Sequence, residues 1–231
     1  VVSYALMPQI HADDERSIVE GLEAQADVVR SARALAGGRP IAVTPVTLVP
    51  RHGPLGERLA VARTDARQAS WFAAAWTLGS LSQLARGGAD SVTYYETIGE
   101  RGISPLEDLA VTHGGESPLY RLLAELADWR ASRVLQCTIN DPLRAAGLAL
   151  QRPDGAIRVL VADLSGDANT ILVGPIALDS ARLRMLGERA RDGAQSRPQP
   201  ARSTAVEGGM VSVELGPYGV ACIDADRSVV V

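Results

Sequence analysis

The sequence predicts an α/β region followed by an all-β region. Strand-like and helix-like segments alternate from residue 1 to about residue 132, and short segments of alternating apolar and polar residues follow up to residue 231. Connections after the helix-like segments are short, whereas those after the second and third strand-like segments are long. Long strand-to-helix loops are typical of parallel α/β folds that carry their site there. We therefore expect the C-terminal strand–helix units of a (β/α)8 barrel in residues 1–132 and a small antiparallel β-sandwich in residues 133–231.

Three strand–helix units are expected in the first region. The predicted strands span residues 1–10, 41–48 and 91–95; the predicted helices follow Asp13 or Asp14, span about 66–86 and begin at Ser117-Pro118. Gly-Gly pairs end the first two helices, Asp65 with Gln68 resembles a capping box, and Pro45 should lie near a strand end or at a bulge. Three units cannot close an eight-stranded barrel, so we expect further strands upstream of Val1; an open sheet is the alternative.

The second region predicts a run of short strands. Pro153-Asp154-Gly155 is a hairpin signal between two of them. The predicted strands lie near 135–139, 148–150, 157–164, 171–173, 182–186, 210–215 and 219–224. Residues 188–208 are rich in Arg, Pro, Ser, Gln and Gly, which predicts a flexible insertion.

The composition narrows the classes of function. The net charge is −4 and all 23 basic residues are arginine, without a basic cluster, so we expect neither nucleic-acid nor membrane binding and no catalytic lysine. Cys137 and Cys222 have no zinc-ligand spacing, and free thiols are favoured over a bridge. We expect no metal, no cofactor and a cytoplasmic protein, with a small carbohydrate as the partner. The oligomeric state is left open.

Glu96 is the leading candidate for chemistry. It ends the short buried strand of residues 91–95, and polar residues at the carboxyl ends of barrel strands are where such folds place catalysis. There it can act as a nucleophile, or as a general acid or base, on a sugar-like substrate. The alternative is a structural carboxylate paired with Arg101 or Arg51. A glycosidase needs a second carboxylate, for which Asp13, Asp14, Glu100 or an upstream residue are the options.

Several other polar residues are expected near the same edge. Gln9 and His11 end the first strand, and His11 can bind a hydroxyl or move a proton near neutral pH. Thr44 lies near the end of the second strand, and Arg51 can clamp a carboxylate or lactone oxygen. Three of these residues also have a plainer interpretation. His11 can be a structural histidine, Thr44 a packed core residue and Arg51 a solvated loop arginine.

The aromatic residues divide into two groups. Tyr94 and Tyr95 should point in opposite directions along the strand, so that one, with Tyr95 as the candidate, faces the barrel interior. Trp71 and Trp76 are expected to pack within a helix and not to form a sugar platform. His113 in a glycine-rich loop is a weak candidate.

Three segments resemble one known family. PQIHADD (8–14), SWFAAAWTLGSLSQLARGGADSVTYYET (70–97) and SPLYRLLAELADW (117–129) resemble the C-terminal part of the D-apionate lactonase family, whose members are similar to clan-A glycoside hydrolases. The resemblance covers most of residues 1–130. It implies a barrel followed by a β-sandwich, hydrolysis of a sugar lactone to its aldonate in bacterial sugar catabolism, and a site lined by Glu96, His11 and Gln9.

One departure bears on the mechanism. A clan-A glycosidase carries its nucleophilic glutamate on the seventh barrel strand. If the helix at 118–130 is the last one of the barrel, Glu96 lies on the eighth strand, and the seventh, IAVTPVTL, has no glutamate. This favours a lactonase, with Glu96 or His11 activating water and Arg51 or a loop N–H holding the oxyanion. The alternatives are a glycoside hydrolase with an upstream carboxylate, and a non-catalytic carbohydrate-binding or structural fragment.

Overall fold

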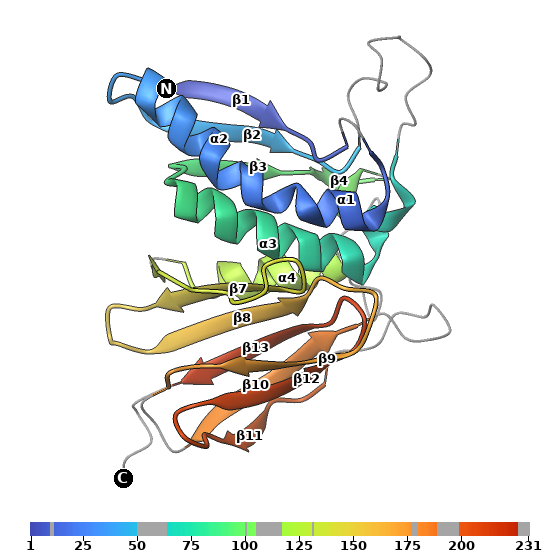
Figure 1. Cartoon of the computed structure of the whole chain (residues 1–231), viewed down its shortest axis with the longest axis vertical. Helices are drawn as coiled ribbons and strands as arrows, with labels where there is room; N and C mark the ends of the chain where they lie inside the picture. Colours follow the sequence, from blue (N-terminus) through green and yellow to red (C-terminus); the bar gives the residue numbers. More distant parts are fainter. Residues whose placement is uncertain are drawn as a thin grey trace.

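A computed structural model describes residues 1–9, 12–49, 64–99, 101–104, 117–130, 132–176, 180–188 and 199–225 (Figure 1). Its upper part is a parallel three-stranded sheet in the order β1-β2-β3. The strands are β1 (Val2–Leu6), β2 (Ile41–Val46) and β3 (Ser91–Tyr94). The helices are α1 (Glu15–Glu20), α2 (Leu22–Leu35), the 3-10 turn η1 (Ala66–Ala69), α3 (Trp71–Gly87) and α4 (Pro118–Ala127). The expected strand–helix alternation is confirmed.

Local signals set the helix ends. The Asp14 side chain accepts a hydrogen bond from the Ser17 amide, and Ser117 caps α4 ahead of Pro118. Gly88 ends α3 with φ 85°, a left-handed conformation that glycine adopts without steric cost. These caps confirm the predicted helix starts at Asp14 and Ser117 and the predicted stop at the second Gly-Gly pair.

The helix expected from Ala66 is interrupted. Residues 66–69 form η1, and the α-helix begins only at Trp71. Asp65 does cap this turn through the Arg67 amide, but the Gln68 side chain donates to the Gly102 carbonyl at 3.0 Å and does not return to Asp65. The predicted capping box is therefore wrong for Gln68, because its side-chain amide hydrogen-bonds to the distant Gly102 carbonyl instead of to the backbone of Asp65.

Pro45 lies where the register of β2 slips. The pairing register of β2 shifts between Val43 and Val46 with both of its neighbours. On β1 the shift lies between Tyr4 and Leu6, and on β3 it lies between Val92 and Tyr94. A proline lacks the N–H that a regular ladder needs, so a break in register is where it fits. This confirms the prediction that Pro45 lies near a strand end or at a bulge.

The lower part is a β-sandwich. Its large sheet has the order β11-β10-β13-β8-β7-β6, and a two-stranded sheet, β12-β9, packs on it. The strands are β6 (Arg133–Leu135), β7 (Ala145–Gln151), β8 (Ile157–Asp163), β9 (Asn169–Val173), β10 (Ser180–Gly187), β11 (Arg202–Ala205), β12 (Val211–Leu215) and β13 (Val220–Ala225). A hairpin joins β7 to β8 at Gly155, as predicted.

Two expectations for this region are corrected. The alternating run expected over 135–139 ends as a strand at Leu135. Part of the expected insertion at 188–208 is ordered, since Arg202–Ala205 form β11 and pair with β10; residues 189–198 lie outside the described residues. Both cysteines are free, as predicted, with Cys222 buried and Cys137 half-buried.

Helix α3 lies between the two parts (Figure 1). Its first ten residues, from Trp71 to Ser80, are all buried. One side packs on α2, and the other packs on β7, where Ser82 Oγ donates to the Gly147 carbonyl at 2.7 Å. We expected one buried face; the second is buried because the large sheet of the sandwich covers it. No helix in the described ranges is both long and apolar enough to cross a membrane.

Candidate active site

The carboxyl ends of the three parallel strands bring several predicted residues to one edge. Gln9 lies beyond β1, Leu48 beyond β2, and Tyr95 and Glu96 directly beyond β3. Glu96 begins a short strand, β4 (Glu96–Ile98), which pairs in parallel with β5 (Gly102–Ser104). Ligand sites of parallel α/β sheets lie at this edge.

Gln9 ties the ends of two strands together. Its side chain is buried, and Nε2 donates to the Leu48 carbonyl at 2.6 Å and to Asp65 Oδ2 at 2.5 Å. Both N–H donors of the amide are therefore used inside the protein. What Gln9 can still offer to a bound molecule is its carbonyl oxygen.

Asp65 and Arg67 extend this polar cluster. Arg67 Nε and Nη2 donate to the two Asp65 oxygens at 2.9 and 2.6 Å, and Arg67 also bonds the Asp13 carbonyl. Burial by itself would raise the pKa of the Asp65 carboxyl, but hydrogen bonds from Arg67 and Gln9 outweigh it and hold the pKa below its ordinary value of 3.8. Asp65 is thus a charged, fixed group beneath the edge.

The sequence-based interpretation assigned Asp65 only to a helix cap and left out Arg67. The signal available was the Asp-x-Arg spacing at the end of a long loop. The contact with Gln9 spans 56 positions of sequence, so no local pattern reveals it.

Tyr94 and Tyr95 do not alternate. Tyr95 has φ 52°, and this left-handed backbone turns its side chain to the same side as that of Tyr94, with ring centroids 5.8 Å apart. Tyr94 donates to Ser80 Oγ at 2.7 Å, and the Tyr95 hydroxyl lies 2.9 Å from Thr77 Oγ, both on α3. The expectation of opposite directions is therefore wrong. Burial raises the pKa of both phenols above 10.0, so both hydroxyls stay neutral.

Glu96 is exposed at the same edge. About half of its side chain is accessible, and its Oε1 lies 2.7 Å from Arg101 Nη2. The Glu96 amide also donates to the Arg101 carbonyl at 3.1 Å. The pairing with Arg101 that we set out as the structural alternative is thus present, and it also orients a carboxylate that solvent or a substrate can reach.

Thr44 lies on the face of the sheet opposite the helices. Ile41 and Val43 of β2 are fully buried toward the helices, whereas Ala42 and Thr44 alternate with them and are half-buried. Val43 lies opposite Val92, so Thr93, the next residue of β3, shares this face. In a barrel this is the interior face.

The remaining predicted residues lie outside the described residues: His11, Arg51, Glu100 and His113. Asp13, offered as a second carboxylate, is exposed, and Asp14 is the cap of α1. Trp71 and Trp76 are fully buried, which confirms their packing role. Within the described ranges, no group of three or more His, Cys, Asp or Glu side chains is arranged to hold a metal ion.

The fold and this edge define the class: a (β/α) barrel domain joined to a C-terminal immunoglobulin-like β-sandwich. The chain belongs to the D-apionate lactonase family. Residues 1–131 match the family model of the D-apionate lactonase TIM barrel domain, and residues 142–223 match that of its C-terminal immunoglobulin-like domain. The chain is also 30% identical over 142 residues to the D-apionate lactonase of Brucella anthropi, a match that covers 55% of this chain and 23% of the relative.

Solved structures share the architecture. The GH51 arabinofuranosidase of Xanthomonas axonopodis pv. citri superposes with a TM-score of 0.63 at 11% identity, over 97% of this chain and 52% of that one. A 4-O-α-L-rhamnosyl-β-D-glucuronidase of Fusarium oxysporum gives a TM-score of 0.60 at 15% identity, over 91% of this chain and 48% of that one. The chain thus spans about half the length of these enzymes, and they define its fold: barrel strands followed by a sandwich.

Proposed function

We propose that the protein containing this chain hydrolyses a sugar lactone to its aldonate. The observation that carries the proposal is the match of residues 1–131 to the D-apionate lactonase barrel domain. The position of an accessible carboxylate, Glu96, at the carboxyl edge of that domain supports it.

In the proposed reaction, Glu96 or His11 takes a proton from water as the water attacks the lactone carbonyl. The ring C–O bond then breaks, and the proton passes to the departing ring oxygen, which leaves a hydroxy acid. Arg51 or a loop N–H stabilises the oxyanion that forms on the carbonyl oxygen. Arg101 holds the Glu96 carboxylate in place from 2.7 Å.

The other predicted site residues have supporting roles in this proposal. Thr44, on the barrel-interior face, binds a substrate hydroxyl. Gln9 presents its carbonyl oxygen while its amide is anchored to Leu48 and Asp65. Tyr95, whose hydroxyl is engaged by Thr77, acts as a positioning residue that fixes the backbone turn leading into Glu96.

The test is lactone hydrolysis by the natural full-length protein, followed as acid release at constant pH. Glu96→Gln should lower kcat/KM by about 10²–10⁴-fold, the range for losing a general base. Glu23→Gln, an exposed carboxylate on α2, should leave the rate unchanged. Full lactonase activity in Glu96→Gln would remove Glu96 from the mechanism, and His11→Asn would then be examined next.

Glycoside hydrolysis is the second candidate, because the barrel-plus-sandwich architecture is shared with glycosidases. It requires a second carboxylate about 5–5.5 Å from Glu96 for retention of configuration, or farther for inversion. Release of nitrophenol from a panel of nitrophenyl pentosides and hexosides, without lactone hydrolysis, would favour it. A protein that binds sugars but turns over neither substrate class would favour the third interpretation, a binding module.

A further inference from the structure

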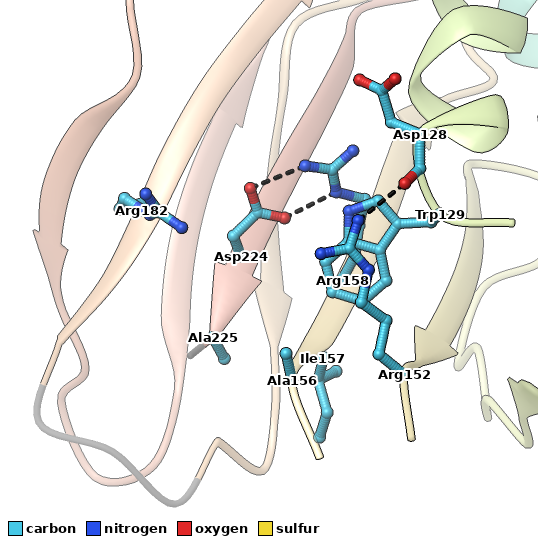
Figure 2. A pocket seen from close by; sticks show the side chains of 9 residues that line it. All are labelled: Asp128, Trp129, Arg152, Ala156, Ile157, Arg158, Arg182, Asp224 and Ala225. Carbon is cyan, nitrogen blue, oxygen red and sulfur yellow. Dashed lines mark hydrogen bonds and ion pairs between the residues drawn. The ribbon is translucent and has the colours of Figure 1, made fainter. Parts of the chain in front are cut away.

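A cleft of about 320 Å³ lies where the end of α4 meets the large sheet of the sandwich (Figure 2). Its lining comes from the residues that follow α4, from the turn between β7 and β8, and from β8, β10 and β13, and none of these residues belongs to the candidate active site. Three of the lining side chains are arginines: Arg152, Arg158 and Arg182. The volume is at the small end of the range for ligand pockets.

Two of these arginines flank one aspartate across three strands. Arg182 on β10 lies opposite Asp224 on β13, and Asp224 lies opposite Arg158 on β8. Arg158 donates hydrogen bonds to both carboxylate oxygens of Asp224, at 2.6 and 2.8 Å, and to a carboxylate oxygen of Glu125 at 2.9 Å. Figure 2 shows Arg182 on the other side of Asp224 from this pair. Among the described residues, no hydrogen bond or ion pair engages the Arg182 guanidinium.

The third arginine is held over an aromatic ring. The Arg152 guanidinium lies 4.3 Å from the centroid of the Trp129 ring, and the Arg158 guanidinium lies 4.8 Å from it. One Arg152 nitrogen donates to the backbone carbonyl of Asp128 at 2.7 Å, while the Asp128 carboxylate points away from the arginines in Figure 2. Arg152 therefore keeps a fixed orientation and most of its N–H donors, without a carboxylate partner in the described part of the chain.

We propose that this cleft binds the carboxylate group of a small molecule through the guanidinium groups of Arg152 and Arg182. Within the described part of the chain, two of the three guanidinium groups in the lining, those of Arg152 and Arg182, have no anionic partner. Both oxygens of the lining residue Asp224 already accept hydrogen bonds from Arg158. A guanidinium presents paired N–H donors that match the two oxygens of a planar carboxylate. Two guanidinium groups already lie over the Trp129 ring, so recognition rests on the anionic group and not on stacking of a sugar ring.

Trp129 provides the readout. Trp71 and Trp76 are fully buried in the core, whereas Trp129 lines the cleft. The experiment titrates the full-length protein with sodium D-gluconate at constant ionic strength, sodium chloride being the replaced salt, and follows both the indole N–H signal of Trp129 by NMR and the heat of binding. Inorganic phosphate, a tetrahedral oxyanion, is titrated in a parallel experiment.

The variants are Arg182→Gln and, as a matched control, Arg202→Gln. Both arginines are exposed on neighbouring strands of the same sheet, and only Arg182 lines the cleft. Because Arg182 has no partner among the described residues, its replacement should leave folding intact. We expect saturable gluconate binding that weakens about tenfold or more in Arg182→Gln and is unchanged in Arg202→Gln.

Three outcomes would overturn the proposal. One is the absence of a saturable response to gluconate in the folded wild-type protein. Another is equal gluconate binding by wild type and Arg182→Gln, which would locate the response elsewhere. The third is a response to phosphate without one to gluconate, which would replace the carboxylate by another anion.

Discussion

Arg158, on β8 of the sandwich, is a buried cation that contacts Glu125 of α4. Only 8% of its side chain is exposed, and it pairs with Glu125 and Asp224, which are 11% and 18% exposed. Burial by itself would lower the pKa of this guanidinium, but the hydrogen bonds and charges of the carboxylates raise it above its ordinary value. Burial also raises the pKa of Glu125, although Arg184 and Arg158 pull it downward. Removing one member of this group leaves the others desolvated and uncompensated.

Replacement of Arg158 by methionine should therefore lower the free energy of unfolding by about 3–5 kcal/mol, the range for breaking a buried ion pair from one side. The matched control is Arg30→Met, which removes an exposed pair with Asp27 on α2 and should change stability by less than about 1 kcal/mol. Urea unfolding of the three proteins measures both values. Equal effects of the two substitutions would mean that the buried group contributes no more than a surface pair.

Asp65 gives a prediction for acid stability. Its folded-state pKa lies below the ordinary 3.8, so its charged form stabilises the fold above pH 3.8, and this contribution is lost as the pH falls through the folded-state pKa. Asp65→Asn should destabilise the protein at pH 7 by about 1–3 kcal/mol, because Arg67 and Gln9 lose a charged acceptor. Below pH 3.8 its stability should converge on that of the wild type. Thermal unfolding from pH 2.5 to 7 tests this, and a constant difference at every pH would contradict it.

At the scale of elements, the α2–α3 pair depends on a close approach at Gly87. A Cβ added there would lie 2.8 Å from the Ala26 carbonyl oxygen and 2.8 Å from Val29 Cβ, both on α2. Such distances force the backbone or a packed side chain to move. The helices can pack at this spacing because the last turn of α3 carries no side chain at this point.

Gly87→Ala should therefore destabilise the protein by about 1–3 kcal/mol, the usual cost of overpacking. Gly21→Ala is the control: Gly21 joins α1 to α2 with φ −66°, and its added Cβ would make only ordinary contacts of 3.5 and 3.6 Å. That substitution should be neutral or stabilise by up to about 1 kcal/mol, through the unfolded chain. Denaturant midpoints compare the two variants, and a neutral Gly87→Ala would show that α2 can shift freely.

The predictions from sequence held where the determinants are local. The caps Asp14 and Ser117, the left-handed Gly88 and the register shift at Pro45 each follow from a residue and its immediate neighbours. The failures involve distant partners: Gln68 bonds Gly102, and α3 is buried on a second side by β7. At the candidate site, Glu96 could be placed at a strand end, but its neighbour Tyr95 turns away from the regular alternation into a left-handed conformation. A prediction that assumes regular alternation of side chains along a strand cannot detect that change.

At the scale of the whole molecule, one apolar core crosses from the barrel part into the sandwich. The cluster around Trp71 and Trp76 includes Leu148 on β7 and Leu160 on β8. Val161, the next residue of β8, points to the other face of the sheet and belongs to a second cluster inside the sandwich. The large sheet is thus apolar on both faces, and one face serves as the surface on which α3 rests (Figure 1). Burial of this shared face couples the folding of the two parts.

Leu148→Ala tests this coupling. Leu148 is 5% exposed on the face of β7 that contacts the barrel helices, and its truncation should cost about 2–5 kcal/mol. If the shared core couples the parts, hydrogen exchange should accelerate in the α3 amides as well as in β7 and β8, even though the substitution lies in the sandwich. Leu172→Ala, at a side chain 63% exposed on β9, should leave exchange in α3 unchanged. Faster exchange confined to the sandwich would mean that the sheet and α3 open independently, and that α3 is held by α2 and the barrel sheet alone.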